Sequence, residues 1–219
     1  LGIGKDGLAG YPLIDVYLTG KELKLAAEVD ASVSDFMTTA RLYCSGLNFT
    51  FNPHRMILNK VTDCYLTRED GERIEIQDDQ LYRVVTDLYT GQMLGSVMEM
   101  SYGLLKIEPK DKDGNPIENL EDQAIMEGDK ELKAWDAIAR YMKSFDDTDG
   151  NGISNVPEYY ETTHGRKVVD ESRNVIDLVK NPNKFSVMIV GIVLVLILII
   201  ILLVVLIRKL IKKRRRKKK

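Results

Sequence analysis

The chain has 219 residues with 31 Lys and Arg against 33 Asp and Glu, so its formal net charge is only −2. Ten of the basic residues lie in 208–219, which leaves 21 basic and 33 acidic residues for positions 1–207. This acidic balance argues against nucleic acid as the partner of the folded part. Two cysteines, Cys44 and Cys64, exclude a disulfide framework. We expect two free, half-buried thiols, although both lie in strand-like runs that could form one disulfide.

The first 53 residues predict two strands around one helix. Residues 13–18 are a strand candidate, and the sequence Thr19-Gly20-Lys21-Glu22 is typical of a capping box, which starts a helix that runs to about Asp30. In the run 41–51, apolar residues alternate at positions 47, 49 and 51 and predict a strand. Asn52-Pro53 then marks a turn.

The middle of the chain carries a hairpin signal, because residues 61–66 and 73–76 are strand-like and flank Asp70-Gly71. The elements expected after this hairpin are, in order, a strand over 82–88, a loop at Thr90-Gly91, a strand over 104–107 and a turn over Asp113-Gly114-Asn115-Pro116.

An amphipathic helix is expected over 129–145. Its apolar positions at helical spacing are Leu132, Trp135, Ile138, Ala139, Met142 and Phe145. The order of elements predicts a mixed α/β (α+β) domain over residues 1–145. Residues 146–184 are polar and thinly apolar, and we expect an acidic loop followed by a stalk.

The sequence of the acidic loop resembles that of a calcium-binding loop. Asp147, Asp149 and Asn151 stand at loop positions 1, 3 and 5, Gly152 at position 6 and Glu158 at position 12. Two features depart from the pattern: the apolar residue falls at position 7 instead of 8, and a proline precedes the glutamate. The loop therefore predicts either a calcium site at these oxygen ligands or an acidic, glycine-rich linker.

Residues 185–207 form an apolar run of 23 residues in which only Ser186 and Gly191 are not strongly apolar. As a helix this run reaches roughly 34 Å, enough to cross a hydrocarbon core of about 30 Å. Ten basic residues follow it and five occur in the twenty residues before it. The positive-inside rule then predicts a single-pass protein of the cell membrane with residues 1 to about 180 outside and the tail 208–219 in the cytoplasm, where it can hold anionic lipid headgroups.

Three segments carry a family resemblance: 17–23 (YLTGKEL), 43–51 (YCSGLNFTF) and 81–89 (LYRVVTDLY). In this order they resemble the C-terminal domain of the 5'-nucleotidase family, strongest over residues 1–107. The chain begins at Leu1 without a signal peptide although the apolar run implies export, so we expect a C-terminal piece of a longer protein.

The resemblance implies a division of labour in the parent protein. An N-terminal metallophosphoesterase domain would hold two divalent metal ions and hydrolyse the phosphate ester. The C-terminal domain would bind the nucleoside, with its base stacked between two aromatic rings. Tyr89 matches the second ring, whereas Leu1 is expected at the position of the first. The family's Gly-Gly-Asp-Gly loop is absent, because residues 90–95 read TGQMLG and offer no acid for a ribose hydroxyl.

Two functions follow. The first is the substrate-binding part of a surface-anchored, metal-dependent 5'-nucleotidase-type hydrolase of nucleotide catabolism, inactive without its N-terminal domain. The alternative is a non-catalytic cell-surface binding module that reuses the same fold. The missing loop acid and the missing first aromatic favour the alternative a little.

Overall fold

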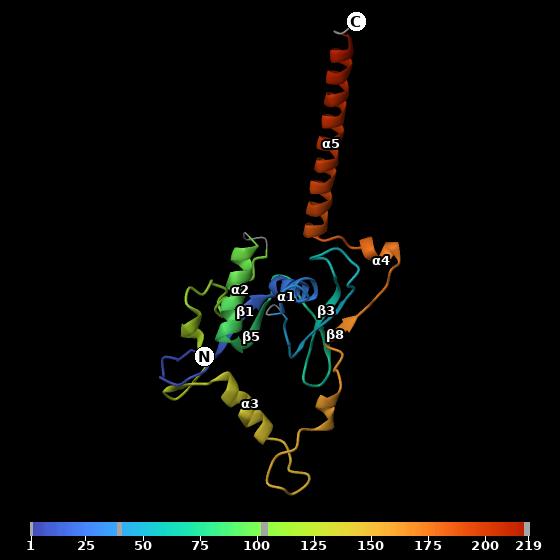
Figure 1. Cartoon of the computed structure of the whole chain (residues 1–219). Coiled ribbons are helices and arrows are strands. Elements are labelled where there is room, and N and C mark those ends of the chain that lie inside the picture. The colour runs from blue at the N-terminus through green and yellow to red at the C-terminus, as the bar shows by residue number, and fades with distance from the viewer. Residues whose placement is uncertain (1, 39–40, 102–104, 217–219) are drawn as a thin grey trace.

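The computed structural model describes residues 2–38, 41–101 and 105–216. Figure 1 shows a folded part made of small sheets and several helices, from which one long C-terminal helix projects. The folded part mixes helices with largely antiparallel strands, so the predicted α/β fold class is confirmed.

The first sheet pairs β1 (Leu13–Thr19) with β5 (Leu81–Asp87), antiparallel, from Leu13 opposite Asp87 to Thr19 opposite Leu81. Alternate side chains of β1, namely Ile14, Val16 and Leu18, are buried, as the period of a strand with one core face requires. Both strands were predicted.

The second sheet has the strand order β4-β3-β2-β8. Its members are β4 (Arg73–Glu75), β3 (Val61–Thr67), β2 (Leu47–Phe51) and β8 (Lys167–Val169). The predicted hairpin of β3 and β4 is confirmed, and Gly71 takes the positive φ of 87° that its turn requires. The predicted strand over 41–51 forms only from Leu47 onward.

Helix α1 (Gly20–Val33) lies between the two sheets (Figure 1). The predicted capping box is present at its start, and the helix runs three residues beyond Asp30. One side packs Leu23 and Ala26 onto Leu18 of β1, and the other packs Ala27 and Ala31 onto Phe49 of β2. Two hydrophobic clusters of the core therefore lie on opposite sides of α1.

Helix α2 (Leu88–Met100) corrects the loop expected at Thr90-Gly91. The carboxylate of Asp87 accepts hydrogen bonds from the backbone N–H of Thr90 at 3.0 Å and from its hydroxyl at 2.6 Å, which starts the helix directly after β5. A Cβ atom on Gly91 would lie 2.7 Å from Cδ1 of Ile14. This glycine therefore serves close packing of α2 on β1, and its role in a turn was a wrong inference.

The segment after α2 is held to the domain by single bridges. Residues 105–107 form no strand, contrary to the expectation for 104–107, and Leu104 lies outside the described residues. Ile107 is nevertheless buried, and Lys110 bridges both Tyr17 of β1 and Pro116 across the predicted turn.

The helix expected over 129–145 is shorter in the structure. Residues 130–131 form β7 (Lys130–Glu131), which pairs with β6 (Met126–Glu127) after the short 3₁₀ helix η2 (Leu120–Gln123), and α3 spans only Ala134–Lys143. The reason is the buried Lys133, whose ammonium group lies between Glu131 and Asp6 and fixes the residue before α3. The expected inner face is largely exposed at Trp135, Ile138 and Met142.

Residues 165–184 also differ from expectation, because most of them lie on the domain. β8 adds a parallel strand to β2, and α4 (Val175–Val179) follows it. This segment was expected to be a stalk because it is polar and has few apolar residues. The three-residue strand β8 depends on the open edge of β2, which the local sequence does not reveal.

Helix α5 (Lys184–Arg216) contains the predicted apolar run. Within Lys184–Lys213 an 18-residue window has a mean hydropathy of 3.9, and the helix is long and apolar enough to cross a membrane. Residues 217–219 of the predicted tail lie outside the described residues. Phe185 is only 4% exposed and packs with Val29 and Leu105, so the base of α5 belongs to the core of the domain.

Candidate functional site

Tyr89 lies in the first turn of α2, at the edge of the first sheet, and its side chain is 44% exposed. In the sequence it comes directly after the strand expected over 82–88. Its position in a helix follows from the start of α2 at Leu88. The ring still stands at the end of β5 with one open side.

A small pocket adjoins Tyr89. It encloses about 60 Å³ between α1, α2 and the segment around residue 41, and its walls include Met93, Leu94, Ile107 and Arg41. This space is large enough for only a few water molecules, so a nucleoside would extend out of it. The walls are mostly apolar, with one cation at Arg41, which suits a flat ring with a polar or anionic substituent.

A second aromatic ring lies beside the first. The ring centroids of Tyr11 and Tyr89 are 5.5 Å apart with planes tilted by 40°. The pairing of β1 and β5 explains this contact: Leu13 lies opposite Asp87, and the two tyrosines stand two residues beyond these ends. Sequence reasoning missed Tyr11 because the antiparallel register was not known, although an aromatic just before a strand was a visible signal.

The spacing of the two rings limits what they can bind. A base sandwiched between them needs two contact distances of about 3.5 Å, or roughly 7 Å between rings. At 5.5 Å the rings touch each other directly. A base therefore stacks on an outer face of the pair, or one ring must move. Leu1, the expected counterpart of the first family aromatic, lies outside the described residues.

The residues that directly follow Tyr89 in the chain include no acid. Residues 90–98 contain no Asp or Glu. The carboxylate of Asp87 is occupied at the start of α2 by the N–H and hydroxyl groups of Thr90. The segment that directly follows Tyr89 therefore supplies no carboxylate for a sugar hydroxyl, unlike the loop that the family resemblance implies.

The candidate calcium loop is exposed and lies far along the chain from Tyr89. Asp147 accepts hydrogen bonds from the backbone N–H groups of Gly152 and Gly150, both at 2.8 Å, and the bond from Gly152 contributes most to holding the pKa of this carboxyl below its ordinary range. The side-chain amide of Asn151 donates to Asp149 at 2.9 Å. Glu158 begins the short 3₁₀ helix η3 (Glu158–Glu161) after Pro157.

Metal binding by these residues stays a prediction. Within residues 2–38, 41–101 and 105–216, no three His, Cys, Asp or Glu side chains are gathered so that they could hold a metal ion. The loop supplies two aspartates and one asparagine close together in sequence, and calcium would have to draw Glu158 toward them.

Both cysteines are free and half-buried, as expected. Burial raises the pKa of the Cys64 thiol to about 12 and raises that of Cys44 above its ordinary value. At neutral pH both side chains are protonated thiols, so neither is an activated nucleophile.

Comparison with known proteins gives a family match and similar solved structures. Residues 9–101 match the sequence model of a family described as 5'-nucleotidase, C-terminal domain. Among solved structures, a 5'-nucleotidase precursor from Thermus thermophilus is similar at 19% identity with a TM-score of 0.48, over 74% of this chain and 26% of that one. The NAD nucleotidase of Haemophilus influenzae is similar at 20% identity with a TM-score of 0.34, over 47% of this chain and 19% of that one.

The chain thus spans about a quarter of the Thermus protein and about a fifth of the Haemophilus protein. No curated protein sequence matches it significantly.

Proposed function

We propose that this chain, whose residues 9–101 belong to the 5'-nucleotidase C-terminal domain family, is the substrate-binding part of a nucleotidase-type phosphohydrolase anchored at the cell surface. The family match carries the proposal, because that domain's partner in the family is a hydrolytic domain. The exposed ring of Tyr89 beside an apolar pocket supports a nucleoside as the bound group.

Hydrolysis in the parent protein is assigned to a domain that precedes this chain. A two-metal mechanism uses divalent ions about 3.5–4 Å apart to stabilise the attacking and leaving oxygens. The described residues of this chain do not fit such a centre, since they gather no three metal-ligand side chains. The proposal therefore gives both ions to the N-terminal domain and gives binding alone to this chain.

Base stacking is the proposed role of Tyr89. Its open face would take a nucleobase, and Arg41 in the wall of the same pocket would attract an anionic group of the nucleotide. The missing acid in residues 90–98 weakens recognition of a ribose. Because this acid is missing, a second function is also proposed: a non-catalytic surface module that binds another flat ligand at the rings of Tyr11 and Tyr89.

Anchoring is assigned to α5, in which an 18-residue window within Lys184–Lys213 has a mean hydropathy of 3.9. The ten basic residues after the apolar run favour a cytoplasmic tail and an exterior domain. The tail would also attract anionic lipid headgroups of the inner leaflet, at about 1 kcal/mol per basic residue near the surface.

The test is hydrolysis of nucleoside monophosphates by the full-length parent protein with manganese. Tyr89→Ala should weaken substrate binding by about 1–3 kcal/mol because stacking is lost. Tyr89→Phe should be nearly silent, because the ring makes the contact. Tyr159→Ala, the same change at an exposed tyrosine on η3, is the matched control.

Two outcomes would decide against the proposal. A normal Michaelis constant in a folded Tyr89→Ala protein would end the stacking hypothesis. A parent protein without turnover, whose nucleoside binding still depends on Tyr89, would support the binding module instead.

A further inference from the structure

Helix α4 carries an apolar face that nothing in the described part of the domain covers. Val175, Ile176 and Val179 are 71%, 70% and 65% exposed. Their spacing puts them on one side of the helix, while Asp177 and Leu178 are half-buried toward the domain. Single exposed apolar residues are common on protein surfaces, but three on little more than one helical turn form a local patch.

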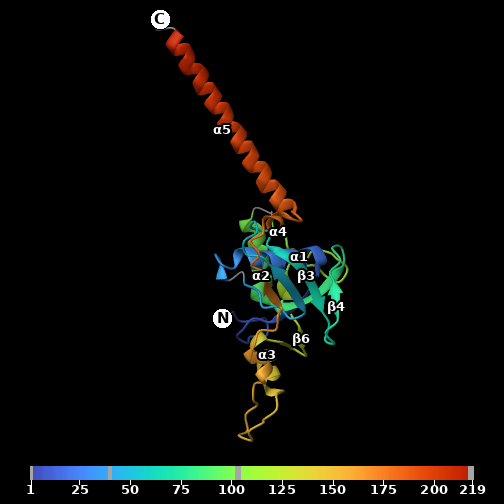
Figure 2. The same cartoon turned by 90° about the vertical axis from the view of Figure 1, so that its right-hand side faces the viewer.

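The position of α4 indicates what covers this patch. Only residues 180–183 separate α4 from α5. Figures 1 and 2, two views at right angles, both show α4 at the end of the folded part from which α5 leaves. If α5 enters a bilayer at its base, α4 lies at the level of the lipid headgroups.

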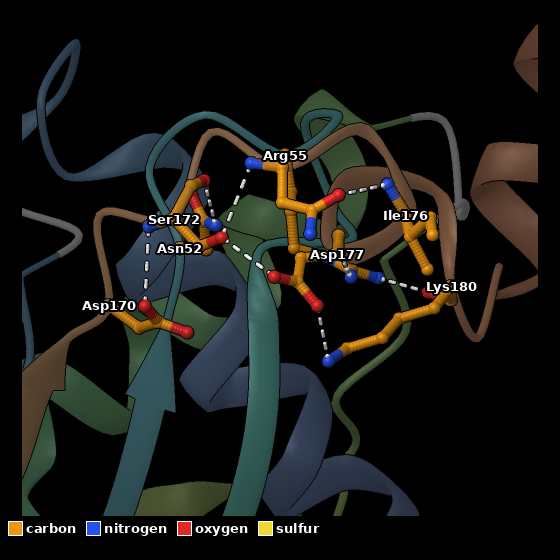
Figure 3. Close-up of polar contacts among 8 residues, drawn as sticks. Asn52, Arg55, Asp170, Ser172, Ile176, Asp177 and Lys180 are labelled. Atoms are coloured by element: carbon orange, nitrogen blue, oxygen red, sulfur yellow. Dashed lines mark hydrogen bonds and ion pairs between the residues drawn. The ribbon is translucent and has the colours of Figure 1, made fainter.

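A buried arginine fixes α4 to the domain (Figure 3). Arg55 is 5% exposed, and its guanidinium donates to the carbonyl oxygens of Asp177 and Lys180, the latter at 2.7 Å. It also donates to the carbonyl of Asn59 at 2.7 Å. The last carbonyl groups of a helix lack hydrogen-bond donors within the helix, and the C-terminal end of a helix attracts a positive charge. Arg55 supplies both the N–H donors and the charge at the end of α4.

Further bonds hold the beginning of α4. The side-chain amide of Asn52 donates to the carbonyl of Ser172 at 2.7 Å, and the hydroxyl of Ser172 donates to the carboxylate of Asp177 at 2.7 Å. A helix of five residues is not stable by itself in water. These contacts explain why α4 exists and why its apolar face keeps one direction relative to the domain.

The base of α5 is fixed in the same way. Asn183 donates to the carbonyl of Leu58, and its side-chain oxygen accepts the N–H groups of Phe185 and Ser186 at 3.0 Å. The ring of Phe185 is buried in the domain. The domain is therefore attached at two neighbouring points, α4 and the first turn of α5, rather than through a flexible stalk.

We infer that α4 is a membrane-contacting element, whose apolar face enters the outer lipid interface beside α5 and holds the domain in one orientation on the bilayer. The inference rests on the proposed membrane insertion of α5. The basic residues Arg173, Lys180 and Lys184 flank the patch, as is typical of interfacial helices, whose charged ends reach the headgroups. A second protein chain is a poorer occupant, because a stable interface needs about 800 Å² per partner and α4 has five residues.

The experiment measures the depth of Ile176 in a bilayer. The full chain carrying Ile176→Trp is inserted in vesicles of phosphatidylcholine and phosphatidylserine, with and without brominated acyl chains that quench tryptophan. The control is Ile153→Trp, also 70% exposed but located in the loop after α3. Trp135 is present in both proteins, so its contribution cancels in the comparison.

We expect strong quenching and a blue-shifted emission for Ile176→Trp and neither for Ile153→Trp. Equal emission of the two variants, in protein that floats with the vesicles, would overturn the inference and leave the anchor intact. Protein that does not float with vesicles would overturn the anchor itself and, with it, this inference.

Arg55→Lys tests the positioning role. Lysine keeps the charge but loses the planar fork that reaches two carbonyls at once, so quenching of Ile176→Trp should fall by more than about half while flotation stays unchanged. Asn52→Ala removes the bond to Ser172 and a bond from the N–H of His54 but leaves the contacts of Arg55 in place, so it should lower quenching less. Undiminished quenching in both variants would show that α4 is not held by these contacts.

Discussion

Glu22 joins the start of α1 to a segment far along the chain, so removing its charge should destabilise the fold. One carboxylate oxygen accepts the N–H of Thr19 at 2.8 Å and its hydroxyl at 2.7 Å. The other accepts the ammonium of Lys110 at 2.6 Å and the N–H of Glu108 at 3.1 Å. Glu22→Gln keeps the size of the side chain but replaces one accepting oxygen with a donating NH₂ group.

The hydrogen bonds lost in Glu22→Gln set the size of the change in the free energy of unfolding. A hydrogen bond to a charged group contributes about 1.5–3 kcal/mol, and a helix cap contributes about 1 kcal/mol. The single carbonyl oxygen of the amide can accept either from Thr19 or from Lys110 and Glu108, but not from both sets of donors. We therefore expect Glu22→Gln to lower the free energy of unfolding by about 3 kcal/mol. Glu118→Gln, the same change at an exposed position, should alter it by less than about 0.5 kcal/mol.

The pH dependence gives a second signature. Burial raises the pKa of Glu22, but the bonds from Lys110, Thr19 and Glu108 together outweigh it and hold the pKa below its ordinary value. A carboxyl whose pKa is lower in the folded state stabilises the fold above its unfolded pKa and loses that contribution as the pH falls through its folded pKa. The difference between wild type and Glu22→Gln should therefore be full at pH 7 and shrink below about pH 4.3.

Urea unfolding of the full chain in detergent measures both effects. Trp135 reports the transition, because its indole N–H donates to the carbonyl of Ala9 at 3.1 Å, just before β1. A loss below about 1 kcal/mol at pH 7, or a loss that grows on acidification, would refute the reasoning about Glu22.

Two further predictions concern cysteine and calcium. Burial raises the thiol pKa values of Cys44 and Cys64, so both thiols should react slowly with a disulfide reagent at pH 8 in the folded protein. Both should react rapidly when the protein is unfolded in urea without reductant. A count of zero reactive thiols in urea would instead indicate a disulfide. Calorimetric titration with calcium should show one site that disappears in Asp147→Ala and persists in Asp146→Ala, whereas no heat at millimolar calcium would leave the linker interpretation.

The sequence was most informative where neighbouring residues decide the structure. The capping box at Thr19 and Glu22 is a contact over three residues, and the Asp70-Gly71 hairpin depends on a turn that Gly71 permits. The apolar run of α5 is visible from composition alone. These signals are local, so they do not require knowledge of which segments meet.

The candidate site was only half visible from the sequence. Tyr89 could be singled out from the family resemblance, but Tyr11 meets it because β1 and β5 pair with one particular register. The role of Gly91 also could not be decided from the sequence. Glycine at that position permits a turn or a close approach, and only the side chain of Ile14 lying against it decides for the close approach.

The sequence by itself therefore determined most strands of the two sheets beside α1, the start of α1 and the long apolar helix α5. Tertiary structure alone decided that residues 167–169 complete a sheet, that Arg55 holds α4, and that Phe185 is a core residue as well as the first apolar residue of α5. The physical reason is sequence distance. Each of these contacts joins residues that are far apart in the chain, and no local pattern records which partner a strand edge, a guanidinium group or an aromatic ring will find.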